Sequence, residues 1–327
     1  GAGYIGSVMT AALLVRGHHV VVCDNLGHGH RDAVSADAAF VECDMGDRTR
    51  VEAALRGHHI EAVIHMAAHI EVGESVREPG KYLDNNTVRG VALAEAMLAA
   101  DTQCLILSST AAVYAPSPAP LTETSPLQPG NPYGLSKLFL EHVLAWYATR
   151  GLRYYALRYF NAAGATAAHG ERHQPESHLI PLVLEAAAGE RPAIQIFGDD
   201  YDTPDGTCIR DYIHVSDLAD AHLLALDRLA AEPAPAAPSV IPDLTARAFN
   251  LGNGRGFSVR EVIAAAERVS GRRIPVEIRP RRPGDVDRLV ASSDKIRALG
   301  WQPQVTALDA IVASAWRWKQ NRARAAR

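Results

Sequence analysis

Cysteine is scarce in this chain, and its few cysteines are far apart. They form no C-x-x-C pair, so the sequence indicates neither a disulfide framework nor a zinc site. Such usage is typical of a reducing compartment, and we expect a cytoplasmic protein. The cysteines are Cys23, Cys43, Cys104 and Cys208.

An excess of basic charge and long apolar runs are also missing. Lys and Arg number 33 against 37 Asp and Glu, so we expect no nucleic-acid partner. No uninterrupted apolar stretch reaches the ~18 to 20 residues of a membrane-spanning helix, so we expect no membrane partner. The chain has 14 histidines, but no matched carboxylate or cysteine pattern accompanies His18, His19, His28, His30, His58 and His59, and no metal ion is expected.

The chain does have length and a regular alternation of two kinds of segment. A folded chain of 327 residues buries roughly 75% of the surface that it exposes when unfolded, enough for one large or two modest domains. Short β-branched runs alternate with amphipathic stretches in the first half, which predicts an α/β fold with a doubly wound parallel sheet. The predicted strands are residues 19–23, 39–43, 62–65, 104–107 and 154–158, and the predicted helices are residues 7–16, 48–56, 85–100 and 133–150.

A glycine-rich turn, GAGYIG at residues 1–6, leads directly into the first predicted helix. Such glycines let the backbone approach a pyrophosphate at a helix N-terminus, although a plain strand-to-helix turn has the same pattern. The next predicted strand ends at Asp24, whose carboxylate can accept ribose hydroxyls and repels a 2′-phosphate. The sequence therefore predicts NAD, and not NADP, as the cofactor.

Asp44 ends the following strand, where it can receive the adenine amino group or cap the helix that follows it. A dinucleotide-binding fold also needs a strand before its glycine turn, in the middle of the sheet, and no residue precedes Gly1. We therefore expect the sequence to be truncated at its N-terminus.

The alternation ends near Asn161, which predicts two domains. We expect residues 1–161 to form an NAD-binding, Rossmann-like domain that lacks its first strand. Residues 162–327 should form mainly a smaller, mixed α/β lobe that binds substrate, with some segments that return to the large domain. Residues 232–242 contain four prolines, which predicts a surface connection or insertion.

Tyr133 and Lys137 are spaced by four residues and therefore lie on one face of a helix. A nearby ammonium and a positively charged nicotinamide both favour the phenolate, which makes the tyrosine a candidate base. By itself the pair is equally typical of an amphipathic surface. The apolar strand at residues 104–107 delivers Ser108 and Thr110 to the sheet edge where chemistry occurs in such folds, although local backbone capping is the simpler role for Ser108.

Taken together, the ordered motifs of the chain resemble those of the UDP-glucose 4-epimerase family, which belongs to the extended short-chain dehydrogenases/reductases. The resemblance runs over essentially the whole sequence. Its motifs are GYIG (3–6), DNL (24–26), VIHMA (63–67), GESV (73–76), Thr110 with YxxxK (133–137), YFN (159–161) and RDYIHV (210–215).

The resemblance implies a role for each matched position. Tyr133 would be the base, Thr110 would assist at the sugar 4-hydroxyl, and Lys137 would hold the nicotinamide ribose. The implied NAD site comprises Gly3, Tyr4, Ile5, Gly6, Asp24, Asn25, Asp44, Ala67, Asn85, Ser108, Tyr133, Lys137 and Tyr159. The implied UDP-hexose site comprises Thr110, Asn161, Leu179, Phe197, Arg210, Arg282 and Asp285.

Guanidinium groups suit a diphosphate, although salt bridges to Asp211 or Asp285 would equally explain Arg210 and Arg282. The chain departs from the family at two places. It has His69 where many members have a nearby lysine that approaches the NAD phosphates. It also has Leu289 where some members carry a tyrosine, and the smaller side chain predicts room for an N-acetyl group, hence some activity on UDP-N-acetylhexosamines.

Reversible inversion at C4 of UDP-glucose and UDP-galactose, through a 4-keto sugar with tightly bound NAD, is the predicted activity. A sugar-nucleotide 4,6-dehydratase would need an acid pair after the threonine, and this chain has Ala111 and Ala112 there. A noncatalytic dinucleotide-binding regulator would not need Thr110, Tyr133 and Lys137 together. The resemblance also predicts a homodimer that pairs the helices at residues 85–100 and 133–150.

Overall fold

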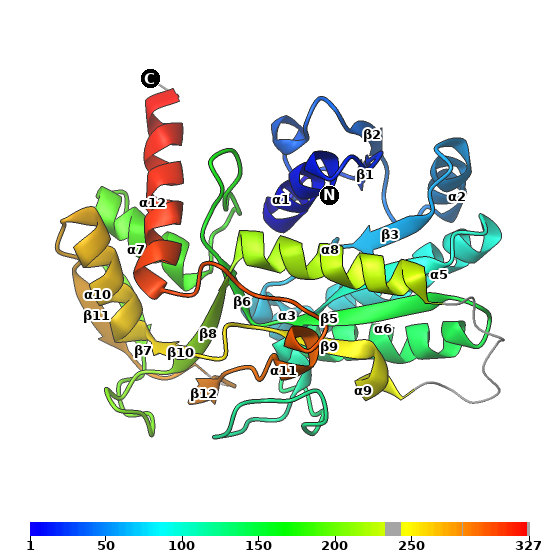
Figure 1. The fold of residues 1–327 in the computed structure, drawn as a ribbon. Coiled ribbons are helices and arrows are strands. Elements are labelled where there is room, and N and C mark those ends of the chain that lie inside the picture. Colours follow the sequence, from blue (N-terminus) through cyan, green and yellow to red (C-terminus); the bar gives the residue numbers. More distant parts are fainter. Residues whose placement is uncertain (233–242, 283, 326–327) are drawn as a thin grey trace.

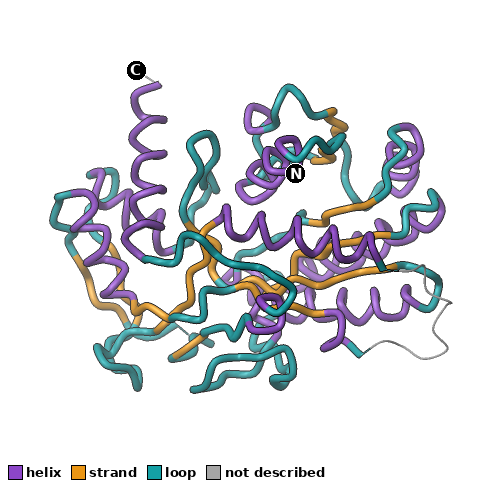
Figure 2. The backbone as a smooth tube through the Cα atoms, in the orientation of Figure 1, coloured by secondary structure: helices purple, strands orange, loops and turns teal. Residues whose placement is uncertain are grey.

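The computed structural model describes residues 1–232, 243–282 and 284–325 (Figure 1). In the smooth trace of Figure 2, the strands run through the middle of the molecule and most helices lie outside them. The predicted connection at residues 232–242 lies outside the described residues, apart from Glu232.

Parallel strands form the centre of the larger lobe. One sheet has the order β3-β4-β5-β9, and β1 pairs with β2 in a second sheet. Among the described strands, none connects β1 to β3 by hydrogen bonds. The bounds are β1 Val21–Asp24, β2 Ala39–Glu42, β3 Ala62–His65, β4 Cys104–Thr110, β5 Arg153–Tyr159 and β9 Ala248–Leu251.

Both faces of the four-stranded sheet are covered, as the alternation of apolar side chains along β4 requires. Leu105 and Leu107 pack in the cluster that contains Leu144 of α6, while Ile106 packs in the cluster that contains Leu218 of α8. Figure 1 shows α8 on one side of these strands and α6 on the other. The prediction of a doubly wound parallel α/β fold is confirmed.

The predicted helices of the larger lobe all form, with shifted ends. The predicted helix at residues 85–100 begins as a π-helical turn, η2, and becomes α-helical only at Arg89. In this turn the buried Asn86 side chain accepts the backbone N–H of His69 and donates to its carbonyl oxygen, both at 2.9 Å. The main helices here are α1 Tyr4–Val15, α2 Arg48–Gly57, η2 Leu83–Val88, α5 Arg89–Ala99, α6 Pro132–Ala148 and α8 Val215–Ala231. Shorter ones are η1 Arg31–Ala33, α3 Val72–Arg77, α4 Pro79–Tyr82, η3 Ala111–Val113, α9 Leu244–Arg247 and α11 Asp294–Arg297.

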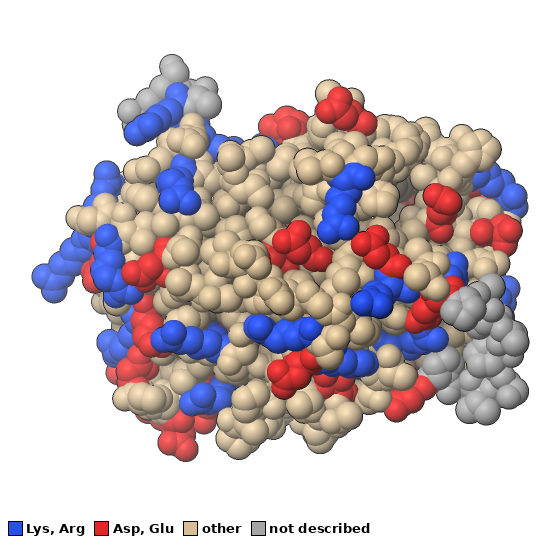
Figure 3. All heavy atoms as spheres, in the orientation of Figure 1, with Lys and Arg blue, Asp and Glu red and all other residues tan. Residues whose placement is uncertain are grey.

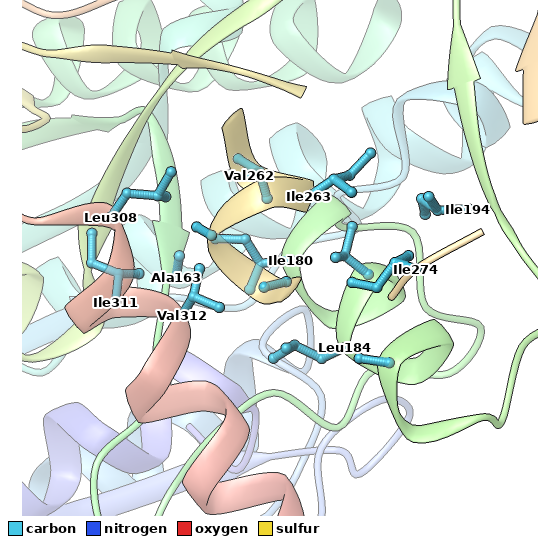
Figure 4. Packing of buried hydrophobic residues seen from close by; sticks show 14 of the residues in the cluster. Ala163, Ile180, Leu184, Ile194, Val262, Ile263, Ile274, Leu308, Ile311 and Val312 are labelled. Carbon is cyan, nitrogen blue, oxygen red and sulfur yellow. The ribbon is translucent and has the colours of Figure 1, made fainter. Parts of the chain in front are cut away.

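The second lobe has a core of its own. Ile180 and Leu184 of α7, Val262 of α10 and Ile311 of α12 pack into one apolar cluster (Figure 4). Its strands form a mixed sheet of order β10-β8-β12 with β6 also on β8, and a parallel pair β7-β11. The bounds are β6 Asn161–Ala163, β7 Ile194–Phe197, β8 Ile209–His214, β10 Gly256–Ser258, β11 Val276–Arg279, β12 Arg288–Leu289, α7 Leu179–Ala188, α10 Val259–Ser270 and α12 Leu308–Ala325.

We propose on this basis that residues 1–161 and 162–327 are a cofactor lobe and a substrate lobe. β9 is a segment of the second half that joins the first lobe, because it pairs in parallel with β5 of the main sheet.

Candidate functional site

A cleft of about 1790 Å³ lies at the carboxyl ends of the parallel strands and extends to the second lobe. Ligands of open α/β sheets bind at this edge. The lining includes every residue that the sequence predicted for the site. These are Gly3, Tyr4, Ile5, Gly6, Asp24, Asn25, Asp44, Ala67, Asn85, Ser108, Thr110, Tyr133, Lys137, Tyr159, Asn161, Leu179, Phe197, Arg210, Arg282 and Asp285.

The glycine-rich turn presents bare backbone to the cleft. A Cβ at Gly6 would collide with the carbonyl group of Gly1, so only glycine fits there, whereas Gly3 faces open space. The N-cap position of α1 is Gly3, so no side chain bonds to the N–H groups of the first turn. These groups are therefore left for an anion. Asp24 secures the turn to β1, because its carboxylate accepts the N–H groups of Ala2 and Leu26, each at 2.8 Å. This arrangement fits a dinucleotide pyrophosphate.

Asp44 holds the neighbouring loops together and does not cap α2. The cap is Asp47, which accepts the N–H of Arg50 at 3.1 Å. Asp44 accepts the N–H of Gly46 at 2.8 Å and the side-chain amide of Asn25 at 2.9 Å, and it binds the guanidinium of Arg89. Partial burial acts against ionisation, but these contacts hold the pKa of Asp44 below its usual value. The capping role considered for Asp44 is therefore wrong.

The first turn of α6 packs directly on the segment that follows Thr110. Asn131 caps this helix by accepting the N–H of Gly134 at 2.9 Å. A Cβ at Gly134 would collide with the carbonyl oxygen of Ala112, so glycine allows this close approach. As a result Tyr133 lies beside Thr110, whose side chain acts against the rise in the pKa of Tyr133.

Burial is the largest influence on the pKa values of Tyr133 and Lys137. It raises the pKa of Tyr133, Thr110 opposes that rise, and Glu71 adds to it. Burial also lowers the pKa of Lys137 to about 8, although Glu141 acts in the opposite direction. The Lys137 ammonium donates to the carbonyl oxygen of Ser108 at 2.7 Å. The protein alone therefore does not produce a phenolate, and a positively charged ligand in the cleft would help to do so.

At the far end of the cleft, two arginines share one carboxylate. Arg210 and Arg282 approach Asp285 at 3.5 and 3.3 Å. Arg282 also lies over the Phe197 ring, 4.4 Å from its centroid. The salt bridges to Asp285 that the sequence left open thus form, whereas Asp211 accepts backbone N–H groups of Asn253, Gly254 and Ala291 instead. Two cations beside one anion leave a net positive charge that suits a diphosphate.

Sequence reasoning missed a group of acidic and histidine side chains in the cleft. Glu71 and His173 approach at 3.2 Å, which raises the pKa of His173. Glu171, Glu176 and His178 place possible ligand atoms within 4.8 Å of one another. The absence of a metal ion stays a prediction. Only Glu71 comes from a distant segment, whereas Glu171, His173, Glu176 and His178 lie within eight residues, a local clustering that could have marked them.

The fold and the cleft together define a Rossmann-type enzyme with a short-chain dehydrogenase/reductase arrangement of threonine, tyrosine and lysine. The chain belongs to the NAD dependent epimerase/dehydratase family, whose sequence profile matches residues 1–241.

Proteins similar to this chain are named UDP-glucose 4-epimerase or UDP-Glc/GlcNAc 4-epimerase. The UDP-glucose 4-epimerase of Halalkalibacterium halodurans is 47% identical over 326 residues, which is 98% of this chain and 94% of that protein. The structure of UDP-glucose 4-epimerase from Brucella ovis in complex with NAD is 44% identical with a TM-score of 0.89, covering 97% of this chain and 95% of that one. The UDP-Glc/GlcNAc 4-epimerase from Campylobacter jejuni is 42% identical with a TM-score of 0.82, covering 98% and 97%.

Proposed function

We propose that this protein interconverts UDP-glucose and UDP-galactose by inverting the configuration at C4, with NAD held in the cleft. The observation that carries the proposal is the meeting of Thr110, Tyr133 and Lys137 between the glycine-rich turn and the two arginines. The names of the relatives and their coverage of the whole chain support it.

NAD fits the cleft because bare N–H groups of α1 suit its pyrophosphate and Asp24 suits its ribose hydroxyls. Lys137 would hold the nicotinamide ribose. NAD bound there would supply the hydride acceptor and donor for C4 of the sugar.

The residues of this chain handle the proton and the position of the sugar. Tyr133 takes the proton of the 4-hydroxyl as the C4–H bond breaks, which leaves a carbonyl group at C4. Thr110, which lies beside Tyr133, would contact the same oxygen. Arg210 and Arg282 hold the diphosphate while the keto sugar rotates within the cleft. Tyr133 then returns the proton.

The test is direct. Purified protein is incubated with UDP-galactose and no added NAD, and UDP-glucose is measured. Conversion is expected because a cofactor that is regenerated within the site stays bound. No conversion, with or without added NAD, would exclude this activity.

Leu289 leads us to propose that N-acetylated substrates are also accepted. It lines the cleft and pairs in register with Arg210 across β12 and β8. We expect turnover of UDP-N-acetylgalactosamine by the parent and a loss of at least tenfold in Leu289→Tyr, with UDP-galactose turnover retained. Leu289→Met is the size-matched control and should keep both activities. A parent that turns over UDP-galactose but not UDP-N-acetylgalactosamine would contradict this prediction.

We also propose a homodimer through α6 and the η2–α5 segment. Large apolar side chains are exposed on this side: Trp146 is 61%, Val88 59% and Phe139 44% accessible. Such exposed apolar groups are typical of association surfaces. Trp146→Glu with Phe139→Glu should convert a dimer to a monomer in light scattering. Val15→Glu, which alters an 89% exposed valine on α1, should leave the dimer intact. A monomeric parent would rule the dimer out.

Other partners and the compartment are proposed on simpler grounds. On the face seen in Figure 3, acidic and basic side chains intermix, which does not favour a nucleic-acid partner. The four cysteines are free, and we propose the cytoplasm, where thiols stay reduced. Among the described residues, no helix has both the length and the apolar character needed to cross a bilayer.

A further inference from the structure

A histidine outside the predicted site is bonded to one of its residues. His222 lies on α8 and is completely buried. Its Nδ1 is 2.8 Å from the carbonyl oxygen of Leu218. A carbonyl oxygen only accepts, so Nδ1 carries the hydrogen. Burial lowers the pKa of His222 to about 4, so the ring is neutral at neutral pH and Nε2 is left without a hydrogen.

The partner of Nε2 is the hydroxyl of Tyr159, on the last residue of β5. The two rings meet edge to face, with their centroids 5.3 Å apart. Because Nε2 can only accept, the hydroxyl must donate, and its hydrogen therefore points away from the cleft. Burial raises the pKa of Tyr159 well above its usual value, so the donor keeps its hydrogen, while a hydrogen bond with Ser108 opposes the rise.

Tyr159 lies next to the proposed chemistry. It is opposite Thr110 in the register of β4 and β5, and Thr110 lies beside Tyr133. Both Tyr159 and Tyr133 line the cleft, and a negative charge on Tyr133 would further raise the pKa of Tyr159. Tyr159 is therefore a second phenol near the proposed base, and the reaction needs only one of the two to exchange a proton.

We propose that His222 is a positioning residue that holds the hydroxyl hydrogen of Tyr159 on the interior side. Tyr133 is then the only phenol that exchanges a proton with the sugar. Without His222, the Tyr159 hydroxyl is free to rotate and to donate its hydrogen toward the Tyr133 oxygen. A hydrogen bond from this new donor would occupy the Tyr133 oxygen, which must be free to accept the sugar proton. This inference rests on the proposed function, in which Tyr133 is the base.

The kinetic test uses the full chain and five proteins: the parent, His222→Leu, His222→Gln, Tyr159→Phe and the Tyr159→Phe/His222→Leu double variant. His222→Leu should lower kcat for UDP-galactose by roughly tenfold and leave KM within about twofold, the effect of one misplaced hydrogen bond. His222→Gln retains an acceptor and should recover most of kcat. In the Tyr159→Phe background, His222→Leu should have no further effect, because no hydroxyl is left to turn.

Three results would overturn the proposal. His222→Leu could match the parent in kcat, His222→Gln could be as slow as His222→Leu at equal bound NAD and equal thermal stability, or the loss could persist in the Tyr159→Phe background. The last two would show a purely structural role for His222.

A second measurement does not depend on activity. ¹⁵N NMR of histidine-labelled protein, with the His222→Gln spectrum subtracted to assign the signal, should show a neutral ring protonated on Nδ1. A ring protonated on Nε2 would exclude the donation from Tyr159, even in an active enzyme. If the parent fails to convert UDP-galactose, the proposed function fails, and the NMR result still decides whether His222 holds Tyr159 as described.

Discussion

Replacement of Tyr133 by phenylalanine is expected to lower kcat for UDP-galactose by roughly 10²- to 10⁴-fold with little change in KM. Only the hydroxyl oxygen is lost, and the ring that lines the cleft remains. In the proposed function that oxygen exchanges the sugar proton, whereas Arg210 and Arg282, which pair with Asp285, would supply binding to the diphosphate.

The matched control is Tyr201→Phe. Tyr201 is also a buried tyrosine, but it does not line the cleft and its hydroxyl has no hydrogen-bond partner among the described residues. This variant should keep the parent's kcat. Near-normal turnover in Tyr133→Phe, at unchanged bound NAD, would show that another group is the base.

Replacement of Glu141 by glutamine is expected to destabilise the protein by about 3–5 kcal/mol, because it leaves a buried charge without its partner. The Arg158 guanidinium, which is completely buried, binds Glu141 through two nitrogens at 2.6 and 3.1 Å. Ser109 also donates to Glu141, and Arg158 donates to the Tyr114 hydroxyl at 2.8 Å. This network joins α6, which carries Tyr133 and Lys137, to β4 and β5.

Urea unfolding followed by circular dichroism measures the loss. Glu95→Gln serves as the control, since Glu95 pairs with the exposed Arg150 at 2.6 Å and such surface pairs contribute about 1 kcal/mol or less. Equal stabilities of the Glu141 and Glu95 variants would show that the buried network does not hold these elements together.

Local patterns were sufficient for much of the site. The α6 spacing of Tyr133 and Lys137, the glycine turn and the acidic strand ends follow from neighbours in sequence, so they could be predicted. The parallel arrangement then brings all strand ends to one edge, which is why the predicted residues line one cleft.

Other features could not be predicted, because their partners are distant in sequence. Asp44 binds Arg89, 45 residues away, while the neighbouring Asp47 caps the helix. Tyr159 binds His222, 63 residues away. Neither contact has a periodic or motif signal.

The sequence by itself determined the fold class, the cofactor type and a set of residues that line one cleft, because spacing along helices and strand ends is a local property. Only the tertiary structure decided which groups shift the pKa values of these residues and which charges pair with them. Burial, and not the lysine charge, sets the direction of the Tyr133 pKa, and one carboxylate of Asp285 serves two arginines. The physical reason is that desolvation and shared ion pairs depend on which segments pack together, and no single segment contains that information.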